Sequence, residues 1–525
     1  MDYKIVIGLE VHVQLKTASK MFCGCPTLYG MPPNKQTCPV CLGLPGVLPV
    51  INNKAVELAI KAALALNCAI NSPTKFDRKN YFYPDLPKNY QISQYDLPLG
   101  KNGYLDIGKG PTSPSEVAGG LRRTGRKIGI TRAHLEEDSG KSIHEEPGNK
   151  RYETKEKKQE LNYSLVDLNR TGVPLLEIVS EPEISSPEEA HQYLTTLKEL
   201  MIYLGISDCD MEKGSLRCDA NLSIAQLEPN THHKDTKDTK NNSGSVSSVP
   251  LWQNKLGTKT EVKNLNSFKF VAKALEFEAN RQIALLKAGK EVEQETRLWD
   301  DAAGETRRLR GKEAVQDYRY FPEPDLRPIT ISQEWIARVK KTIFELPTER
   351  RTRFVRDYQI PEYDASVLTQ PKEMADYFEE CVKLYNNPKS ISNWLMGEVS
   401  RYLNEQKIEI TEFKIKPNQL TPLLGMLDAK KITSSAAKEV WVEMLASGKT
   451  AEEIISAKGL GIVNDQSAIE EFAKQAIEAN PKIVADYKGG KKAAIQSLVG
   501  QVMRLSKGKA NPEIAKQALE KQLGN

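Results

Sequence analysis

Two close pairs of cysteines near the N-terminus constrain the fold of this chain more than any other sequence feature. Cys23-x-Cys25 and Cys38-x-x-Cys41 place four of the eight cysteines within nineteen residues. Thiolates at this spacing can close a tetrahedral shell around a metal ion. We expect a structural zinc ion, because the four cysteine side chains would fill all four ligand positions and leave none open for catalysis. Four buried or unpaired thiols are the alternative, whereas a redox centre would need only one reactive pair.

The sequence shows no sign of export or of a membrane span. No run of about 18 apolar residues, the length that a membrane helix needs, occurs in the chain. The N-terminus, MDYKIVIGLEVHVQL, lacks the basic start, apolar stretch and cleavage site of a signal peptide. We therefore expect a cytoplasmic protein with no membrane partner, where a reducing environment favours metal over disulfides at the cysteines.

The part of the chain up to about residue 340 indicates an α+β domain, because strand-like runs alternate with helices and turns. A mixed or antiparallel sheet is expected from its strands, which we predict at Lys4 to Leu15, Ile128 to Glu137, Ser215 to Ile224 and Lys259 to Asn264. Apolar residues at helical spacing predict helices at Val56 to Leu66 and Phe270 to Leu286.

The remainder of the chain is predicted to be all-α. Strand-like runs stop after Asp325, and amphipathic helices are clearest at Ile391 to Asn404, Leu420 to Asp428, Ser434 to Ala446 and Lys491 to Leu505. We therefore expect a first domain at 1–340, a helical linker domain at 341–410 and a helical tail at 411–525. Residues 229–249 are polar and repetitive, which predicts a flexible insertion within the first domain.

Acidic and polar residues share one face of several predicted strands. Alternation from Ile5 to Leu15 puts Glu10 and His12 together, opposite an aliphatic face. The same spacing groups Glu136 with His134, Asp219 with Arg217, and Glu261 with Lys263. A sheet with one solvated side would give this pattern strand by strand. If the faces converge, their carboxylates repel and need a cation, and oxygen ligands with one imidazole suit Mg²⁺.

Tyrosines and lysines crowd the segment from Asp77 to Gln91, where they can grip phosphate, stack on a base or simply pack a rigid loop. Established nucleotide motifs are missing. Ser139-Gly140-Lys141-Ser142 resembles the end of a P-loop, but Leu135 occupies the position of its first glycine. The chain also lacks the signatures of class I synthetases and protein kinases.

Positive charge is concentrated at the C-terminus. The net charge of +5 is small for 525 residues, so a nucleic-acid argument depends on where the charges lie. From Pro481 onward nine lysines and arginines face three acids, and glycines accompany Lys491, Lys492, Lys507 and Lys509. This pattern favours contact with a nucleic-acid backbone, and a merely solvated helical face is the alternative.

Six motifs in order resemble the GatB family, the B subunits of the tRNA-dependent amidotransferases; they lie at residues 7–15, 81–88, 134–138, 167–175, 214–221 and 317–325. The resemblance implies a cradle domain, a helical domain and a YqeY-like tail that binds tRNA. It also implies ATP-dependent phosphorylation of the carboxylate on misacylated Glu-tRNA(Gln) or Asp-tRNA(Asn), followed by amidation. An amidase (glutaminase) partner, the A subunit, would release the ammonia, and the small C subunit would complete a heterotrimer.

The resemblance implies that the acidic set surrounds Mg²⁺ and phosphates as the catalytic group, namely Glu10, His12, Glu136, Asp219 and Glu261. We assign ATP binding to Lys79, Tyr81, Tyr83, Lys88 and Arg217. The resemblance also implies zinc at the four clustered cysteines. Two alternatives stay open: a non-catalytic tRNA-binding scaffold, and the related archaeal E-type protein, which carries an inserted domain for which this chain is too short.

Overall fold

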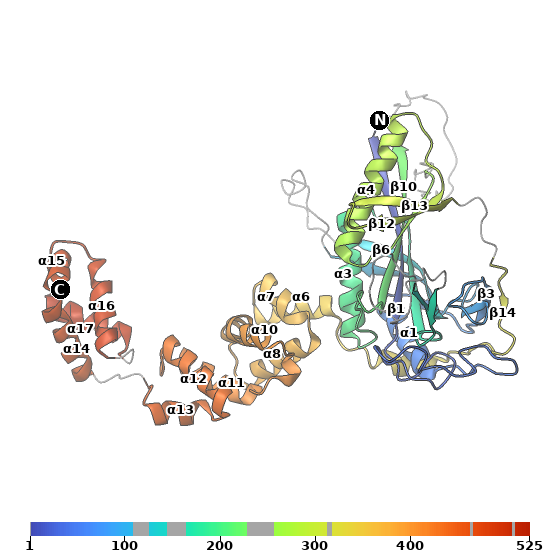
Figure 1. Cartoon of the computed structure of the whole chain (residues 1–525). Helices are drawn as coiled ribbons and strands as arrows, with labels where there is room; N and C mark the ends of the chain where they lie inside the picture. The colour runs from blue at the N-terminus through green and yellow to red at the C-terminus, as the bar shows by residue number, and fades with distance from the viewer. Residues whose placement is uncertain are drawn as a thin grey trace, which may run out of the picture. The chain divides into compact units, whose positions relative to one another are not determined.

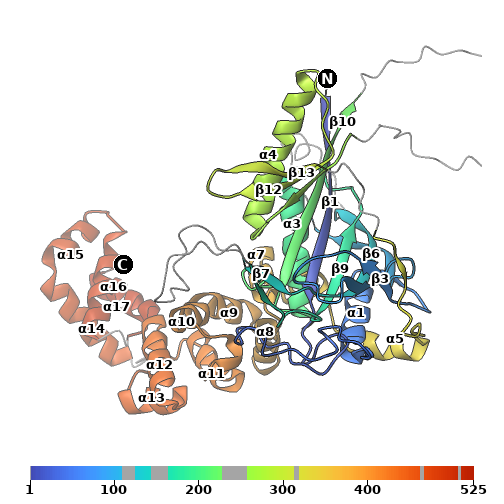
Figure 2. The same ribbon diagram turned by 45° about the vertical axis from the view of Figure 1, so that its right-hand side comes forward.

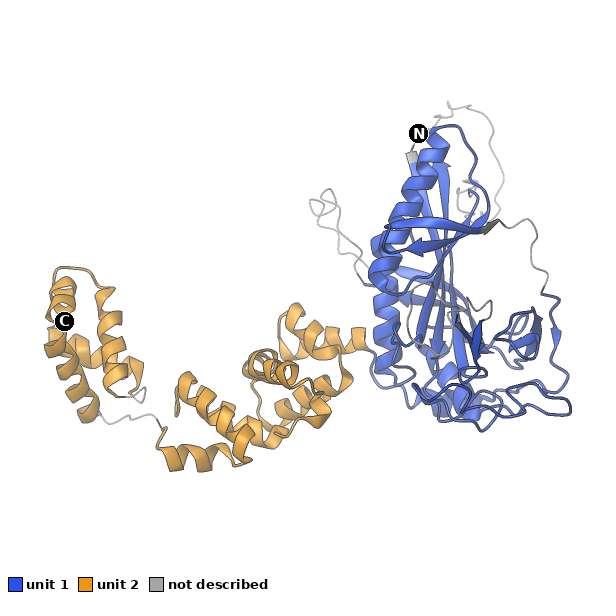
Figure 3. Ribbon diagram, viewed as in Figure 1, with its two compact units in different colours: residues 1–346 blue, residues 347–525 orange. Residues whose placement is uncertain are grey.

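The computed structural model describes residues 2–108, 125–143, 164–227, 257–311, 318–461, 466–506 and 510–524. The insertion expected at 229–249 lies outside these residues, as do Lys507 and Lys509. Two units make up the chain, Met1–Leu346 and Pro347–Asn525 (Figure 3).

A nine-stranded sheet forms the frame of the first unit, with strand order β13-β12-β11-β10-β1-β9-β6-β5-β2. All neighbours pair antiparallel except β11 and β12, so the predicted mixed sheet is confirmed. Figure 2 shows β10, β1, β9 and β6 following one another across the sheet. The strands are β1 Asp2–Gln14, β2 Ala69–Ile70, β5 Gly100–Asp106, β6 Lys127–Glu137, β9 Pro174–Ser180, β10 Leu216–Leu227, β11 Thr260–Lys263, β12 Glu295–Asp300 and β13 Glu305–Gly311.

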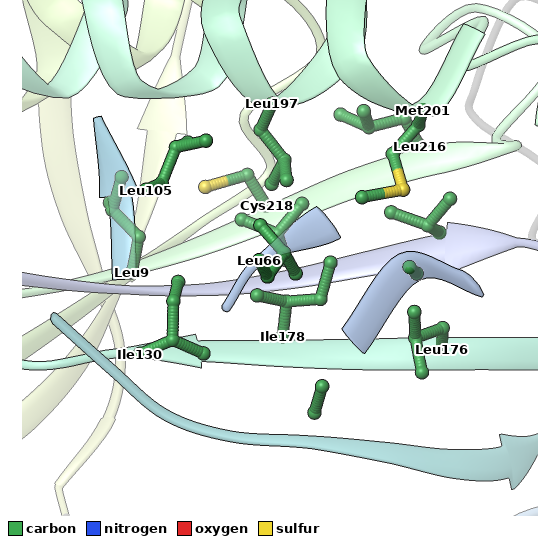
Figure 4. Packing of buried hydrophobic residues seen from close by; sticks show 14 of the residues in the cluster. Leu9, Leu66, Leu105, Ile130, Leu176, Ile178, Leu197, Met201, Leu216 and Cys218 are labelled. Carbon is green, nitrogen blue, oxygen red and sulfur yellow. The ribbon is translucent and has the colours of Figure 1, made fainter. Parts of the chain in front are cut away.

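One face of this sheet is apolar and covered by helices. In β1 the alternate residues Ile7, Leu9, Val11 and Val13 are fully buried, as the period of two in the sequence predicts. Helices α1 (Asn53–Ala65), α3 (Pro187–Tyr203) and α4 (Phe268–Lys287) contribute to the same core. Figure 4 shows Leu197 and Met201 of α3 packed over strand residues that include Leu9, Ile130 and Ile178. The opposite face is therefore left for polar side chains.

Local sequence signals fix where these helices start. Asn52 accepts hydrogen bonds from the backbone N–H groups of the first turn of α1, and Ser267 caps α4 through Phe270. Ser186 caps α3, which begins with proline followed by two glutamates, a favourable arrangement at a positive helix terminus.

Two small sheets and one short helix complete the first unit. The strands β14 (Phe321–Pro322), β3 (Asp77–Asn80) and β4 (Tyr90–Ser93) form one sheet, and β7 (Lys141–Ile143) pairs with β8 (Leu165–Asp167) in the other. Helix α5 spans Gln333–Lys340. The first small sheet brings the segment around residue 80 beside residue 320, as the register of β3 and β14 shows.

The described part of the second unit is all-helical (Figure 1), which agrees with the predicted change of composition. Its elements are α6 Pro347–Tyr358, α7 Glu362–Thr369, α8 Lys372–Leu384, α9 Pro388–Trp394, η1 Leu395–Val399, α10 Ser400–Gln406, η2 Ile410–Glu412, α11 Pro417–Asp428, α12 Ser434–Ser447, α13 Ala451–Lys458, α14 Gln466–Ala479, α15 Pro481–Lys488, α16 Ala494–Leu505 and α17 Pro512–Leu523. The helix predicted at Ile391 to Asn404 is present, with a π-helical turn, η1, in its middle.

One core of the second unit crosses the boundary expected near residue 410. One hydrophobic cluster runs from Phe354 to Ile454, across the boundary expected near residue 410, and a second begins at Ile469. The helices on both sides of residue 410 therefore share one core. Among the described residues, none of the helices combines the length and apolar character that crossing a membrane requires.

Candidate active site

A row of charged side chains crosses the polar face of the large sheet on four adjacent strands. Strand register sets Glu177 of β9 opposite both His12 of β1 and His134 of β6, and sets His12 opposite Arg217 of β10. The Nε2 atom of His12 lies 3.5 Å from a carboxylate oxygen of Glu177 and 3.5 Å from one of Glu136. The Nε2 atom of His134 lies 3.2 Å from Glu177. Antiparallel pairing therefore brings together residues that are distant in sequence.

The buried carboxylates of Glu136 and Glu177 shift the pKa of His12, and the histidines in turn shift the pKa of Glu177. Burial disfavours the charged form of His12, but Glu177 and then Glu136 more than offset this and raise the pKa of His12 to about 9. Burial likewise opposes ionisation of Glu177, yet His134 and His12 hold its pKa well below the ordinary value. An ion pair between His12 and Glu177 is therefore expected at neutral pH.

Further along the same face lies a second acidic group, which contains three of the predicted residues. Glu10 of β1 stands opposite Asp219 of β10, and the side-chain amide of Asn221 donates to Glu10 over 2.9 Å. Lys263 of β11 lies 2.6 Å from Asp219 and 3.2 Å from Glu261. Although burial opposes protonation of Lys263, these two carboxylates raise its pKa. Asp219 and Glu261 thus already have a cation between them.

One set of residues on this face has the geometry to hold a metal ion. Ligand atoms of His12, Glu136 and Glu177 all lie within 4.8 Å of one another. Two of these residues, His12 and Glu136, belong to the predicted set, whereas Glu177 is not among the residues that the sequence assigns to the site. Two carboxylates and one imidazole are suitable donors for a hard divalent cation such as Mg²⁺.

Lys79 and three tyrosines from the small sheet and the loops beside it adjoin this row. The Nζ atom of Lys79 lies 4.8 Å from the ring centroid of Tyr318 and 5.8 Å from that of Tyr81. Burial lowers the pKa of Lys79, but Glu136 and Glu177 outweigh it and raise that pKa overall. Burial, followed by the charge of Glu136, raises the pKa of Tyr81. Tyr83 is 52% exposed and packs edge-on against Tyr81.

Arg217 and Lys88, both predicted to bind ATP, are paired with buried carboxylates. Arg217 lies 2.8 Å from Asp138, which together with neighbouring acids raises the pKa of the guanidinium. Lys88 forms an ion pair with Glu137, whose carboxylate also accepts the backbone N–H of Ile92 over 2.9 Å. A phosphate that contacts either cation would have to share it with these carboxylates.

A cavity of about 350 Å³ opens beside Glu10. Side chains of Val179, Pro182, Asn221 and Ser223 line it together with Gly8, and Lys259 contributes a cation. Its size lies within the usual range of small-molecule sites, and it combines apolar walls with a few polar groups, as such sites commonly do.

The four clustered cysteines converge as the sequence predicts. Their sulfur atoms all lie within 4.8 Å of one another, a spacing that can hold a metal ion. Cys23 donates a hydrogen bond to Cys41 and so lowers the pKa of Cys41 to about 4, although burial opposes this. Burial raises the pKa of Cys25 to about 11. Lys20 places its ammonium 3.6 Å from the sulfur of Cys41.

Comparison with known proteins identifies the family to which this arrangement belongs. A family model described as GatB/GatE catalytic domain matches residues 5–337, and one described as GatB domain matches residues 376–523. The B subunit of the aspartyl/glutamyl-tRNA(Asn/Gln) amidotransferase of Carboxydothermus hydrogenoformans is 52% identical over 99% of both chains. This chain belongs to the GatB family.

Other GatB proteins show the same full-length agreement. Those of Caldanaerobacter subterraneus and Thermotoga maritima are 50% and 48% identical, and cover 100% of this chain and 100% and 99% of their own. The predicted α+β fold class and the predicted role within a tRNA-dependent amidotransferase are thereby confirmed. Matches over the full length favour the B type over the archaeal E-type alternative.

The structure describes two of the four lysines predicted to contact nucleic acid, and both lie in the C-terminal GatB domain. Lys491 and Lys492 lie in the turn between α15 and α16, and Lys491 is 3.0 Å from Asp486. The side chain of Lys491 is 73% exposed, so this ion pair is weak and leaves the ammonium accessible.

Proposed function

We propose that this GatB chain uses ATP to phosphorylate the side-chain carboxylate of misacylated Glu-tRNA(Gln), Asp-tRNA(Asn) or both, and presents the product to ammonia. The observation that carries this proposal is the convergence of His12, Glu136 and Glu177 on one face of the sheet. This arrangement gives the first domain a place for a divalent cation and for the phosphates that such a cation usually binds.

The proposed Mg²⁺ site uses the predicted acidic residues together with Glu177. Its inner group consists of His12, Glu136 and Glu177. Among the described residues of the polar face, this is the set of three whose ligand atoms lie close enough together to bind one ion. Glu10, Asp219 and Glu261 continue the face toward the cavity beside Glu10. When bound, Mg²⁺ would offset negative charge on the phosphoryl group during transfer.

The reaction that we propose has two balanced steps. An oxygen of the substrate carboxylate attacks the γ-phosphorus of ATP, the bond between that phosphorus and the β–γ bridging oxygen breaks, and ADP leaves with the electron pair. Ammonia then attacks the acyl carbon, phosphate leaves with the electrons of the carbon–oxygen bond, and nitrogen loses a proton. Cations near the acidic row, such as Lys79, would stabilise the charge that develops on phosphate.

The nucleoside of ATP would occupy the cavity beside Glu10, whose apolar walls and few polar groups suit a base and a ribose. Lys79 and Tyr81 lie near Glu136, where they would meet the phosphates, and the exposed Tyr83 offers a ring for stacking. Lys88 and Arg217 would contribute indirectly. Their ion pairs with Glu137 and Asp138 would hold these side chains in place at the edge of the ATP site.

Zinc at the cysteine cluster is the second part of the proposal. Four convergent thiols supply the complete tetrahedral shell of a structural site, and the donor set suits a soft dication better than Mg²⁺. When bound, zinc would join the segment that carries Cys23 and Cys25 to the one that carries Cys38 and Cys41.

The proposed partners follow from family membership. An amidase (glutaminase) would supply ammonia, a small third protein would complete a heterotrimer, and misacylated tRNA would bind along the tail at 411–525. Lys491 and Lys492 are accessible for phosphate contacts, and Lys507 and Lys509 belong to the same proposal. Because the product serves translation, we assign this activity to the cytoplasm.

Variants of the acidic face test this function in the complex reconstituted with both partner proteins. Glu136→Gln and Glu177→Gln, in the group that would hold Mg²⁺, should lower tRNA-dependent ATP hydrolysis and amide formation by at least about 100-fold, the usual loss when electrostatic stabilisation is removed. Asp210→Asn, at a partly exposed acid that is paired with Lys213 and lies outside the acidic face, is the matched control. Glutaminase activity of the partner should persist in all three. Near-parental ATP hydrolysis in both test variants would contradict the proposal, and tRNA binding without any ATP hydrolysis by the parent would indicate a scaffold.

A further inference from the structure

Lys20 carries a buried positive charge beside the cysteine cluster. The residue is only 1% exposed. Its ammonium donates to the backbone carbonyl of Gln36 over 2.6 Å and to the sulfur of Cys41 over 3.6 Å. Among the described residues, the structure gives this ammonium no carboxylate partner. A buried charge is costly without a counter-charge, and the thiolate of Cys41 can supply one.

Backbone contacts place Lys20 between the two cysteine pairs. Its N–H group donates to the carbonyl of Cys25 over 2.9 Å, while its side chain reaches Cys41 of the other pair. The next residue, Met21, donates to the carbonyl of Gly172 over 2.7 Å, which anchors this position to the sheet domain. Lys20 therefore contacts both pairs.

We propose that Lys20 is a positioning residue of the metal site, which holds Cys41 for ligation and offsets the excess charge of the thiolates. This inference rests on the proposed zinc site. Four thiolates around a dication leave two negative charges in excess, and such a charge is unfavourable in a partly buried place. The ammonium of Lys20 neutralises one of them, and its hydrogen bond withdraws electron density from the Cys41 sulfur.

The test compares Lys20→Met with a matched lysine variant in the full-length protein. Lys61→Met is the control, because Lys61 also donates to a backbone carbonyl, that of Leu204, over 2.7 Å, but lies in α1 outside the cluster. Zinc transfer to a chromogenic chelator should become roughly 10 to 100-fold faster in Lys20→Met, as expected when a group that supports a ligand is removed. In Lys61→Met the rate should match that of the parent.

Spectroscopy of the Co²⁺-substituted protein separates positioning from a structural effect. Without the hydrogen bond from Lys20 the Cys41 thiolate donates more strongly, so the thiolate-to-cobalt charge-transfer band should move to longer wavelength. If Lys20→Met is insoluble, Lys20→Gln serves for the zinc measurement, because it removes the charge. It should show the faster zinc loss, and a parental rate of zinc loss in it would likewise overturn the role of Lys20.

The outcomes distinguish this inference from the zinc proposal on which it rests. A parental rate of zinc loss together with an unshifted cobalt band in a folded Lys20 variant would overturn the role of Lys20 and leave the zinc site standing. A parent that takes up neither zinc nor cobalt at the cysteines would overturn both.

Discussion

Replacing Glu177 by Gln should lower the pKa of His12 in the metal-free protein. The Nε2 atom of His12 lies 3.5 Å from carboxylate oxygens of Glu177 and Glu136, which raise its pKa from 6.5 to about 9. One opposite charge at such a distance typically accounts for about 1 to 3 units. We therefore expect a fall of about 1 to 3 units in Glu177→Gln, with each unit worth about 1.4 kcal/mol.

The same pair predicts how stability depends on pH. His12 has a raised pKa when folded, so its contribution is complete below its ordinary 6.5 and is lost as pH rises through about 9. Glu177 has a lowered pKa, so its contribution is present above its ordinary 4.5 and is lost as pH falls further. The difference in unfolding free energy between parent and Glu177→Gln should therefore be largest between these two ordinary values and shrink on either side.

Carbon NMR of labelled imidazoles measures the pKa directly. The chain has six histidines, and the His12 signal is assigned by its disappearance in His12→Asn. Glu181→Gln is the control, because the Glu181 carboxylate accepts from Thr131 over 2.8 Å rather than from His12. Addition of Mg²⁺ should lower the apparent pKa of His12, since metal and proton compete for the same nitrogen. An unchanged pKa of His12 in Glu177→Gln would refute this reasoning.

Three further predictions concern other parts of the chain. Metal analysis should find about one zinc per chain, in line with a four-thiolate site, and none in the Cys38→Ser/Cys41→Ser variant. Replacing Lys491 and Lys492 by Ala should weaken tRNA binding and reduce its salt slope by roughly one unit for each phosphate that is no longer neutralised. Arg78→Met should lower the free energy of unfolding by about 3 to 5 kcal/mol in urea titrations, because it leaves the buried Glu323 without its bidentate partner.

Each of these predictions has a control. Lys516→Ala/Lys521→Ala removes two tail lysines that are paired with Glu520 and Glu470, and we expect a smaller change in salt slope. Arg338→Met breaks an exposed pair, for which a loss of about 0 to 1 kcal/mol is usual. Full zinc occupancy in the double cysteine variant, an unchanged salt slope in the first lysine pair, or equal stabilities of the two arginine variants would contradict the corresponding argument.

The sequence predicts faces of strands well and their order poorly. Alternation in β1 places Glu10 and His12 on one side, and the structure agrees, because one covered face and one polar face impose that period. Strand order decides which faces meet, and pairing between distant strands leaves no local signal. The sequence does not assign Glu177 to the site, because its neighbours in β9 on both faces are aliphatic. Polar and apolar residues therefore do not alternate along this strand, and nothing marks its polar face.

Strands β12 and β13 and the core shared across residue 410, which the sequence does not predict, have similar physical causes. In β13, Arg307 and Arg308 lie on opposite faces, and in β12 the face that carries the ion pair of Arg297 with Glu295 at 2.6 Å also carries the buried Trp299, which conceals the period of two. The shared core around residue 410 depends on contacts between helices such as α8 and α11, and composition does not report them. In contrast, the four cysteines were recognisable because their spacing is short enough to be local.

Charge balance across the sheet supports the position of the proposed metal-binding group. Two carboxylates of the polar face, those of Asp219 and Glu261, are already neutralised by a protein cation, because Lys263 forms ion pairs with both. Among the described residues, the ion-pair partners of Glu136 and Glu177 are histidines alone. The pKa of His12, about 9, still lies below the ordinary pKa of a lysine, so His12 yields its proton to a competing divalent cation more readily than a lysine would. The place where a metal can enter is therefore the place where the sheet supplies titratable partners to its carboxylates.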